Sequence, residues 1–298
     1  MSSRGTTSRP VTDEPQSAAL PGFEHQVAGG QIAGAREYQE DDFRIVGFRD
    51  RDPDSCDLLL VLADGMGGHR GGARASRLAI STFVDAFRQE TGGVTARLRS
   101  ALKTANAEVG RVAEEDRRCH GMGCTLVACV VTDDEAVQWT SVGDSPLWHL
   151  RSGVEEDGCR LHRLNADHSM RPLLENLVRR GRMTPEEAEG AAHQLRSALT
   201  GEQLTLVDEA AHPVRLKKGD TIVLASDGLE TLAVGEIRNL CSGQRTSKAV
   251  VSALLQAVES ANRPTQDNAS VVVYRHMEAA GVRRRIERLT AITRPMAR

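Results

Sequence analysis

The apolar residues of this chain follow two spacings, and each spacing predicts a different secondary structure. Continuous apolar runs, such as residues 58–63 and 269–274, are typical of strands that are buried on both faces. Apolar residues at intervals of three and four, as in residues 71–90 and 94–112, predict amphipathic helices that pack on a sheet. Because the helices come in pairs and the strands in runs, the pattern favours an α+β fold with antiparallel sheets over a parallel doubly wound sheet. Further strands are predicted at residues 43–46, 121–132, 138–142, 147–150, 160–164 and 221–225, and a further helix at residues 250–261.

Residues 165–201 differ from the rest of the chain because they are polar and helical in pattern. A first helix is predicted to end at Gly181. Thr184, Pro185 and Glu187 then supply the N-cap, the first helical position and the capping-box partner of a second helix. Since this insertion has few apolar residues to bury, we expect a mobile surface flap.

The two ends of the chain differ in composition from its middle. Residues 1–30 are rich in Ser, Thr, Pro and Gly, which predicts a mostly disordered leader before a folded part that begins near Gln31. The other end, from Glu278 onwards, contains the basic sequence RRRIER. We expect a solvated basic tail there, with binding to a partner as the alternative.

Composition excludes several classes of protein. A length of 298 residues suits one large two-layered domain. A net charge of −3 and an aromatic content of 3% argue against a nucleic-acid-binding protein. The six cysteines show no CxxC spacing, and neither a secretory segment nor a membrane span is evident, so we expect reduced thiols in a cytoplasmic protein. Cys124 and Cys129 lie in an apolar run and are expected in the core.

Acidic residues recur where the predicted strands begin or end. Asp64 directly follows the run at residues 58–63, and Gly65 leaves room for a backbone carbonyl to turn inward. Side chains at strand ends can converge, and ligands that are all oxygen atoms favour Mg²⁺ or Mn²⁺ over zinc. The alternative is a set of surface acids at tight turns with no shared site. The other acids in this position are Glu40, Asp41, Asp144, Asp227 and Asp267.

These motifs, in this order, resemble the PPM (type 2C) family of metal-dependent protein phosphatases, particularly its bacterial Ser/Thr branch. The resemblance covers residues 26–276. The family motif Gly-x-Arg-x-x-Asn-Glu-Asp is similar to Gly34, Arg36, Gln39, Glu40 and Asp41, and the Asp-Gly-Met-Gly-Gly motif stands at residues 64–68. Further similar segments are Gly123-Cys124-Thr125, Val142-Gly143-Asp144-Ser145, Asp167-His168-Ser169, Ser226-Asp227-Gly228-Leu229 and Asp267-Asn268.

The resemblance implies a four-layer αββα sandwich, in which two antiparallel sheets are flanked by paired helices. It also implies a phosphatase domain at residues 26–276 with its flap at about 165–201, a leader at 1–25 and a basic tail at 277–298. The implied cofactors are two Mn²⁺ or Mg²⁺ ions, with a third ion as a further possibility. The implied metal ligands are Asp64 as a bridge, Asp227 and Asp267 for the first ion, Glu40 and the Gly65 carbonyl for the second, and Asp144 with Asp227 for the third.

The catalytic residues that the resemblance implies are Arg36, Asp41 and Asp64. Arg36 would bind the phosphate of the substrate, because a guanidinium matches phosphate oxygens and keeps its charge. Asp41 would orient metal-bound water. A hydroxide that bridges two metal ions would then attack the phosphorus without a protein nucleophile.

Several positions depart from the family pattern. Gln39 replaces an Asn, and Pro146 replaces the Arg of Gly-Asp-Ser-Arg. Thr231 stands where many members have an Asp, which weakens the expectation of a third metal. Met66 occupies the position of a eukaryotic His, so His69 is a candidate general acid, with a solvated loop His as the alternative. His168 is expected to cap or pack and not to bind metal.

The expected function is therefore hydrolysis of phosphoserine and phosphothreonine in proteins. The resemblance implies a bacterial Ser/Thr kinase and its substrates as partners. From the charge and aromatic content we expect no nucleic acid partner, and we expect a monomer. One alternative is a catalytically weak relative that binds phosphoproteins or has a regulatory role. Another is a two-metal phosphoesterase that acts on small molecules or nucleic acid, although the charge of the chain disfavours nucleic acid.

Overall fold

Two antiparallel sheets pack face to face at the centre of the molecule. The structure, a computed structural model, describes residues 26–48, 57–67, 70–155 and 158–277. Among these residues the five-stranded sheet has the order β1-β13-β12-β8-β9, and the six-stranded sheet has the order β10-β7-β6-β3-β2 with β11 also paired to β7. The first sheet comprises β1 (Val27–Ile32), β13 (Ala269–Arg275), β12 (Thr221–Ala225), β8 (Leu147–Glu155) and β9 (Gly158–Arg163). The second comprises β10 (Asp208–Glu209), β7 (Ala136–Val142), β6 (Leu126–Val131), β3 (Asp57–Ala63), β2 (Asp42–Phe48) and β11 (Val214–Arg215).

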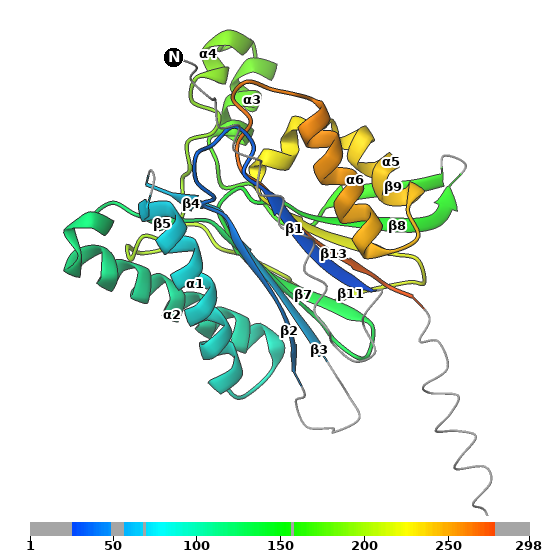
Figure 1. Cartoon of the computed structure of the whole chain (residues 1–298), viewed down its shortest axis with the longest axis horizontal. Coiled ribbons are helices and arrows are strands. Elements are labelled where there is room, and N and C mark those ends of the chain that lie inside the picture. Colours follow the sequence, from blue (N-terminus) through cyan, green and yellow to red (C-terminus); the bar gives the residue numbers. More distant parts are fainter. Residues whose placement is uncertain (1–25, 49–56, 68–69, 156–157, 278–298) are drawn as a thin grey trace, which may run out of the picture.

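Paired helices cover the outer face of each sheet (Figure 1). Helices α1 (Arg70–Gln89) and α2 (Val94–Glu115) share a buried apolar cluster with β3 and β6. Helices α5 (Val234–Gly243) and α6 (Ser247–Ser260) share another cluster with β1, β12 and β13. The predicted four-layer αββα sandwich is therefore confirmed.

Strand β3 shows why the central strands have unbroken apolar sequences. Leu58, Leu60 and Leu62 belong to the cluster between the two sheets. Leu59 and Val61 alternate with them and belong to the cluster under α1 and α2. Successive side chains of a strand point to opposite faces, and here both faces are covered, so every position of β3 is buried.

The structure corrects the predicted elements in three places: the start of β1, the unpredicted helix α5, and a break in one strand. The leader was expected to extend to about residue 30, but β1 begins at Val27 and pairs with β13 along its whole length. Its sequence, VAGGQI, hid this strand because it contains two glycines. Gly29 is required there, since a Cβ at this position would lie 2.3 Å from the Phe43 ring. Helix α5 was not predicted, because only Ile237 and Cys241 of its residues are buried.

The third correction concerns the strand predicted at residues 121–132. It is broken at Thr125 into β5 (Gly123–Cys124), which pairs with β4 (Gly65–Met66), and β6. Two short 3₁₀ helices, η1 (Arg117–Cys119) and η2 (Asp227–Thr231), complete the connections. The hairpin predicted between residues 147 and 164 is confirmed as β8 and β9.

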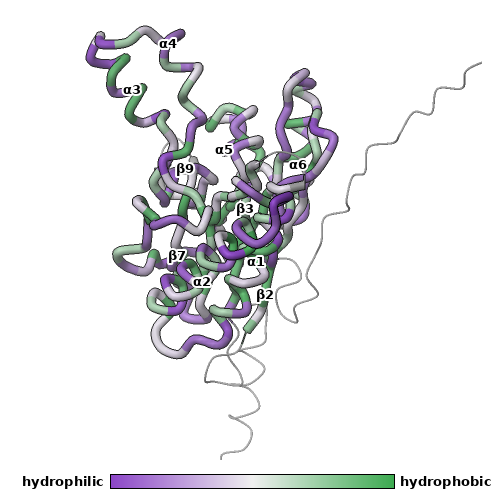
Figure 2. Tube along the Cα trace, turned by 90° about the vertical axis from the view of Figure 1, so that its left-hand side faces the viewer, coloured by the Kyte–Doolittle hydropathy of each residue, from purple (hydrophilic) through white to green (hydrophobic). Residues whose placement is uncertain are grey.

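The predicted flap contains two helices that project from the sandwich (Figure 2). They are α3 (Arg171–Arg179) and α4 (Pro185–Glu189), and α4 has the expected capping box between Thr184 and Glu187. Leu174 is the buried residue of α3, and α4 has none. Little apolar surface therefore holds this segment, and its mobility and boundaries stay a prediction.

Other predictions concern segments outside the described residues. The leader at residues 1–25 and the tail from residue 278 onwards lie there, and so does His69. Cys124 and Cys129 are buried free thiols, as expected. Among the described residues we find no helix that combines the length and the apolar character needed to span a membrane.

The interior of the sandwich provides a stability prediction. Leu60 is completely buried between the sheets, so Leu60→Ala should lower the free energy of unfolding by about 2–5 kcal/mol. Leu173 on α3 is 45% exposed, and Leu173→Ala should change that free energy by less than about 0.5 kcal/mol. Denaturant unfolding of both variants tests this difference. Equal losses would contradict the layer assignment of β3.

Candidate metal centre

The acidic residues predicted from strand ends meet at one end of the sandwich. Asp64 follows β3, Asp227 begins η2 and is separated from β12 by Ser226, and Asp267 precedes β13. They line one cleft of about 660 Å³. The predicted site residues that line this metal cleft are Arg36, Glu40, Asp64, Gly65, Asp144, Asp227 and Asp267. Asp41, the remaining one, is 4% exposed and contacts Ser226 behind the cleft wall.

Glycines make room for two of the expected oxygen ligands. A Cβ on Gly65 would lie 2.3 Å from the Gly72 carbonyl oxygen, so no side chain fits there. A Cβ on Gly72 would lie 2.6 Å from Glu40 Oε1 and 2.9 Å from the Gly65 carbonyl oxygen. The carboxylate and the carbonyl therefore border the same space beside Gly72. The family resemblance implied these two ligands together but not Gly72, because nothing in the adjacent pair Gly71-Gly72 at the start of α1 points to the space beside Glu40.

The carboxylates of the cleft raise one another's pKa. The pKa of Asp64 lies well above its ordinary value, first because of burial and then because of the charges of Asp41 and Asp227. Burial and the Asp227 charge raise the pKa of Asp144 to about 7. Burial also raises the pKa of Asp227, and a hydrogen bond with Asp64 offsets part of this rise. Carboxyl groups that lie this close are stabilised when a cation neutralises them.

The donor atoms fit a hard divalent cation. Carboxylate oxygens and a backbone carbonyl are the ligands that Mg²⁺ and Mn²⁺ prefer. Among the described residues, no three His, Cys, Asp or Glu side chains form a compact group of the kind that holds a metal ion. The structure thus brings the predicted ligands into one cleft, and the assignment of each ligand to an ion stays a prediction.

Arg36 lies at the rim of the cleft and is paired with one of the predicted ligands. Its Nη2 donates to Asp267 Oδ2 at 2.7 Å, with side-chain exposures of 53% and 40%. This ion pair was not predicted. Exposed pairs contribute about 0–1 kcal/mol, so the guanidinium can exchange this partner for a phosphate at small cost.

Asp41 is held from behind the cleft. The Ser226 hydroxyl donates to Asp41 Oδ2 at 2.7 Å, and burial is the main cause that raises the pKa of Asp41 to about 7. Asp41 Oδ1 is buried and has no hydrogen-bond donor among the described residues. A buried acceptor without a donor is costly, and the role of Asp41 in orienting water stays a prediction.

Asn268 holds the Arg36–Asp41 loop against the start of β13. Its Oδ1 accepts from the Glu40 backbone N–H at 2.8 Å. Its Nδ2 donates to the carbonyls of Ala33 at 2.9 Å and Tyr38 at 3.0 Å. The sequence showed Asn268 beside Asp267 but gave no role for it. Its contacts make it the residue that positions Glu40 relative to Asp267.

Thr125 joins Asp64 to the turn that carries Asp144. The Asp64 backbone N–H donates to Thr125 Oγ1 at 3.0 Å, and the Thr125 N–H donates to the Asp64 carbonyl at 2.9 Å. Thr125 Oγ1 also lies 2.7 Å from Ser145 Oγ. The strand is therefore interrupted between β5 and β6 at the residue whose hydrogen bonds hold the Asp64 backbone.

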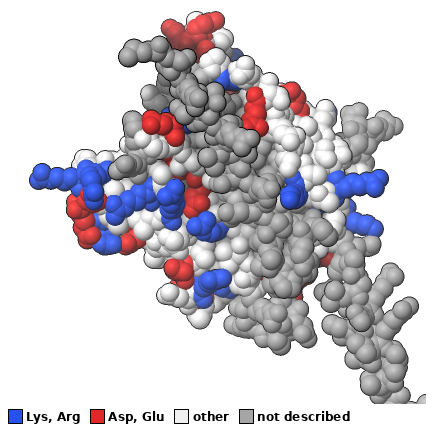
Figure 3. Space-filling view, viewed as in Figure 1, with Lys and Arg blue, Asp and Glu red and all other residues white. Residues whose placement is uncertain are grey.

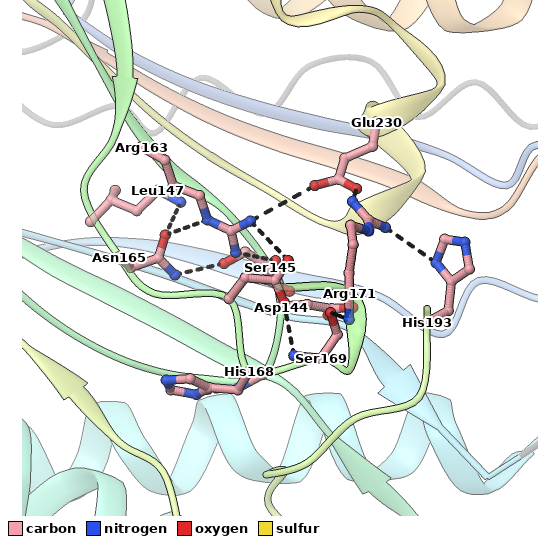
Figure 4. A network of polar contacts seen from close by, with 12 residues as sticks. Asp144, Ser145, Leu147, Arg163, Asn165, His168, Ser169, Arg171, His193 and Glu230 are labelled. Atoms are coloured by element: carbon pink, nitrogen blue, oxygen red, sulfur yellow. Dashed lines mark hydrogen bonds and ion pairs between the residues drawn. The ribbon is translucent and has the colours of Figure 1, made fainter. Parts of the chain in front are cut away.

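Buried side chains hold the turn around Asp144 (Figure 4). His168 Nδ1 accepts from the Gly143 N–H at 3.2 Å, so this His packs against the turn as expected. Asn165 accepts from the Leu147 N–H at 2.8 Å and donates to the Ser145 carbonyl at 3.0 Å. Gly143 has a φ of +103°, which strongly favours glycine.

Two arginines connect this turn to the flap and to η2 (Figure 4). Arg163 donates to the Asp144 carbonyl at 2.6 Å and lies 3.5 Å from Asp167. Arg171 at the start of α3 forms an ion pair with Glu230 of η2. Beside Glu230, the Thr231 hydroxyl donates to Gln266 at 2.7 Å. Thr231, which departs from the family pattern, therefore makes a hydrogen bond within the protein.

Comparison with known proteins gives a consistent result. The family model described as protein phosphatase 2C matches residues 36–273. The serine/threonine phosphatase stp of Listeria monocytogenes is 32% identical over 219 residues, which cover 71% of this chain and 80% of that protein.

Two crystal structures show the same fold. Stp1 from Staphylococcus aureus has a TM-score of 0.69 at 26% identity, covering 85% of this chain and 95% of that chain. The catalytic domain of the phosphatase PstP in complex with two manganese ions has a TM-score of 0.66 at 29% identity, covering 85% and 98%. With its αββα sandwich and its cleft of carboxylates, the chain belongs to the protein phosphatase 2C (PPM) family of serine/threonine phosphatases.

Proposed function

We propose that this chain is a Mn²⁺- or Mg²⁺-dependent enzyme that removes phosphate from phosphoserine and phosphothreonine residues of proteins. The observation that carries the proposal is that seven of the predicted site residues, including Asp64, line one cleft. Its relatives are named serine/threonine phosphatases, and the PstP domain binds two manganese ions. An inactive binding module would have no need for so many buried like charges.

The residues of the cleft divide the work between metal binding and substrate binding. Bound divalent ions supply activation of water and neutralisation of phosphate charge. We assign Asp64 to both ions, Asp227 and Asp267 to the first, and Glu40 with the Gly65 carbonyl to the second. Arg36, which lies at the rim, would bind the phosphate, and Asp41, which lies behind the cleft wall, would orient metal-bound water. These groups suit phosphoryl transfer, which depends on positioning and charge neutralisation.

A third ion has fewer ligands available. Asp144 lines the cleft with Asp227, as the third position requires. The neighbouring residues of η2 are already engaged, because Glu230 pairs with Arg171 and Thr231 donates to Gln266. We therefore propose two strongly bound ions, with Asp144 as a weaker ligand.

A cysteine mechanism is disfavoured at this site. Cys124 lies beside the cleft, because it pairs with Gly65 across β4 and β5. Burial raises the pKa of the Cys124 thiol far above its ordinary value, and the Asp64 charge raises it further. A thiol that stays protonated is a poor nucleophile, so water is the attacking group in this proposal.

The cellular setting follows from the same family relation. We propose phosphoproteins as substrates, a Ser/Thr kinase as the opposing enzyme, a monomeric state and a cytoplasmic location. The four buried cysteines that the structure describes are all free thiols, which supports a reducing compartment.

The central role of Asp64 gives a first test of this proposal. Asp64→Asn should lower the hydrolysis of an aryl phosphate with Mn²⁺ by at least about 100-fold, because it removes the charge shared between the ions. EDTA should abolish the activity of the unaltered enzyme, and added Mn²⁺ should restore it. Asp85→Asn, an exposed change on α1, should leave the rate unchanged. Full activity of Asp64→Asn would contradict the proposed mechanism.

Arg36 provides a test that separates substrate binding from metal binding. Arg36→Ala should raise KM for a phosphopeptide by about 10-fold to 100-fold, because hydrogen bonds to charged groups contribute about 1.5–3 kcal/mol. Calorimetric titration should show Mn²⁺ affinity within about threefold of the original protein. Loss of Mn²⁺ binding with an unchanged KM would show that Arg36 supports the ligand Asp267 and does not bind phosphate.

A further inference from the structure

A second groove lies beside the metal cleft, along helix α1. It has a volume of about 610 Å³. Five residues of its wall form one stripe along α1, and the others come from α2 and from the Arg36–Asp41 loop. We refer to it as the α1 groove, lined by Tyr38, Gln39, Ala73, Arg74, Arg77, Leu78, Ser81 and Val112.

The metal cleft and the α1 groove share a wall. Arg36 and Glu40 line the metal cleft, whereas Tyr38 and Gln39 between them line the α1 groove. At the start of α1, Gly72 borders the Glu40 carboxylate, and the next residues line the groove. An extended peptide advances about 3.3–3.6 Å per residue, so a few residues suffice to cross one loop. A chain bound in the cleft can therefore continue into the groove.

The groove has positive charge that nearby carboxylates neutralise only in part. Arg74 pairs with Asp116, which also pairs with Arg118. The nearby Asp42 pairs with Arg44 at 3.3 Å. Arg77 is exposed, and within the described residues no hydrogen bond or ion pair holds its guanidinium. Burial raises the pKa of the Asp42 carboxylate, and the charge of Arg77 acts on this group only by lowering that pKa, after Arg44. Figure 3 shows basic side chains gathered over the α1–α2 layer, with carboxylates interspersed.

The groove also offers apolar surface of the kind found at protein interfaces. Leu78 of α1 and Val112 of α2 both line the groove. Tyr38 is a large side chain that is 42% exposed. Tyrosine and arginine around a small apolar floor are the combination enriched where proteins bind one another. This surface suits a peptide that carries acidic residues.

We propose that the α1 groove binds an acidic segment of the phosphoprotein substrate while the phosphorylated residue occupies the metal cleft. Arg77 is the specificity-determining residue, because its guanidinium is exposed on the groove wall and, unlike that of Arg74, is not held in an ion pair. The preference rests on the proposed function, since it adds a docking surface to the same reaction.

The test compares phosphothreonine peptides that differ only in charge. One peptide has Asp and Glu at three to six positions on either side of the phosphothreonine, and its match has Asn and Gln there. The Mn²⁺-loaded full chain should hydrolyse the acidic peptide with a kcat/KM about threefold to tenfold higher, through a lower KM. An aryl phosphate, which cannot reach the groove, serves as the measure of the chemical step.

Three variants locate the effect. Arg77→Glu should abolish the preference for the acidic peptide and leave aryl phosphate hydrolysis unchanged. Arg88→Glu makes the same charge change on the same helix eleven residues further along, outside the groove, and should keep the preference. Ser81→Lys adds a positive charge to the groove and should strengthen the preference, a gain that misfolding cannot produce.

Several results would overturn the inference. Equal kcat/KM values for the two peptides in the original enzyme would do so, and so would equal effects of Arg77→Glu and Arg88→Glu, which would show unspecific attraction. If aryl phosphate is hydrolysed but neither peptide is, the proposed function fails instead. The groove is then judged by fluorescence anisotropy of the unphosphorylated acidic peptide: binding that Arg77→Glu removes and Arg88→Glu keeps would support it, and no binding would refute it.

Discussion

Holding Asp41, Asp64 and Asp227 close together costs free energy, because buried carboxylates lose hydration and repel one another. Burial is the largest cause of the raised pKa of each of these carboxyl groups, because the protein removes the water that would stabilise the charged form. Such an arrangement persists only where the backbone that carries the acids is rigid. The two packed sheets provide that rigidity, since β3 is buried along its whole length and β12 and β13 pair through five residues. The core thus stabilises a cleft that would otherwise spread apart.

The loops that carry the acids are fixed by side chains that do not themselves enter the chemistry. Asn268 links the Arg36–Asp41 loop to the start of β13. Thr125 links Asp64 to Ser145 in the turn that carries Asp144, and Asn165 forms a hydrogen bond across the same turn. Each of these three residues is buried and makes hydrogen bonds through two or more atoms, so each holds the loop that it contacts in one place. Gly65 and Gly228 complete the frame, because a Cβ on Gly228 would lie 1.9 Å from the Asn268 carbonyl oxygen. The spacing between acids distant in sequence is therefore determined by contacts between their loops.

How much of this the sequence could predict depends on how local each cause is. The apolar runs of β3 and β13, the periodicity of α1 and α2, and the capping box at Thr184 are local, and each was predicted. Strand β1 and helix α5 have weak local patterns and form because of their neighbours, as Gly29 under the Phe43 ring shows. The list of acids in the cleft was predictable from strand ends and family resemblance. The pairing of Arg36 with Asp267 and the roles of Asn268 and Gly72 were not, since each depends on two segments meeting in space.

The Arg36–Asp41 loop links the two surfaces that the protein offers to a substrate. Arg36 and Glu40 line the metal cleft while Tyr38 and Gln39 line the α1 groove, so one loop forms part of both surfaces. Asn268 forms hydrogen bonds with a residue of each surface, with the N–H of Glu40 for the cleft and with the carbonyl of Tyr38 for the groove. The loop is thus held from the side of β13, and the groove is a preformed surface beside the cleft. Binding to a preformed surface loses less conformational entropy than binding to a surface that must be ordered first, so under the proposal modest charge complementarity at Arg77 would suffice for a preference among phosphoproteins.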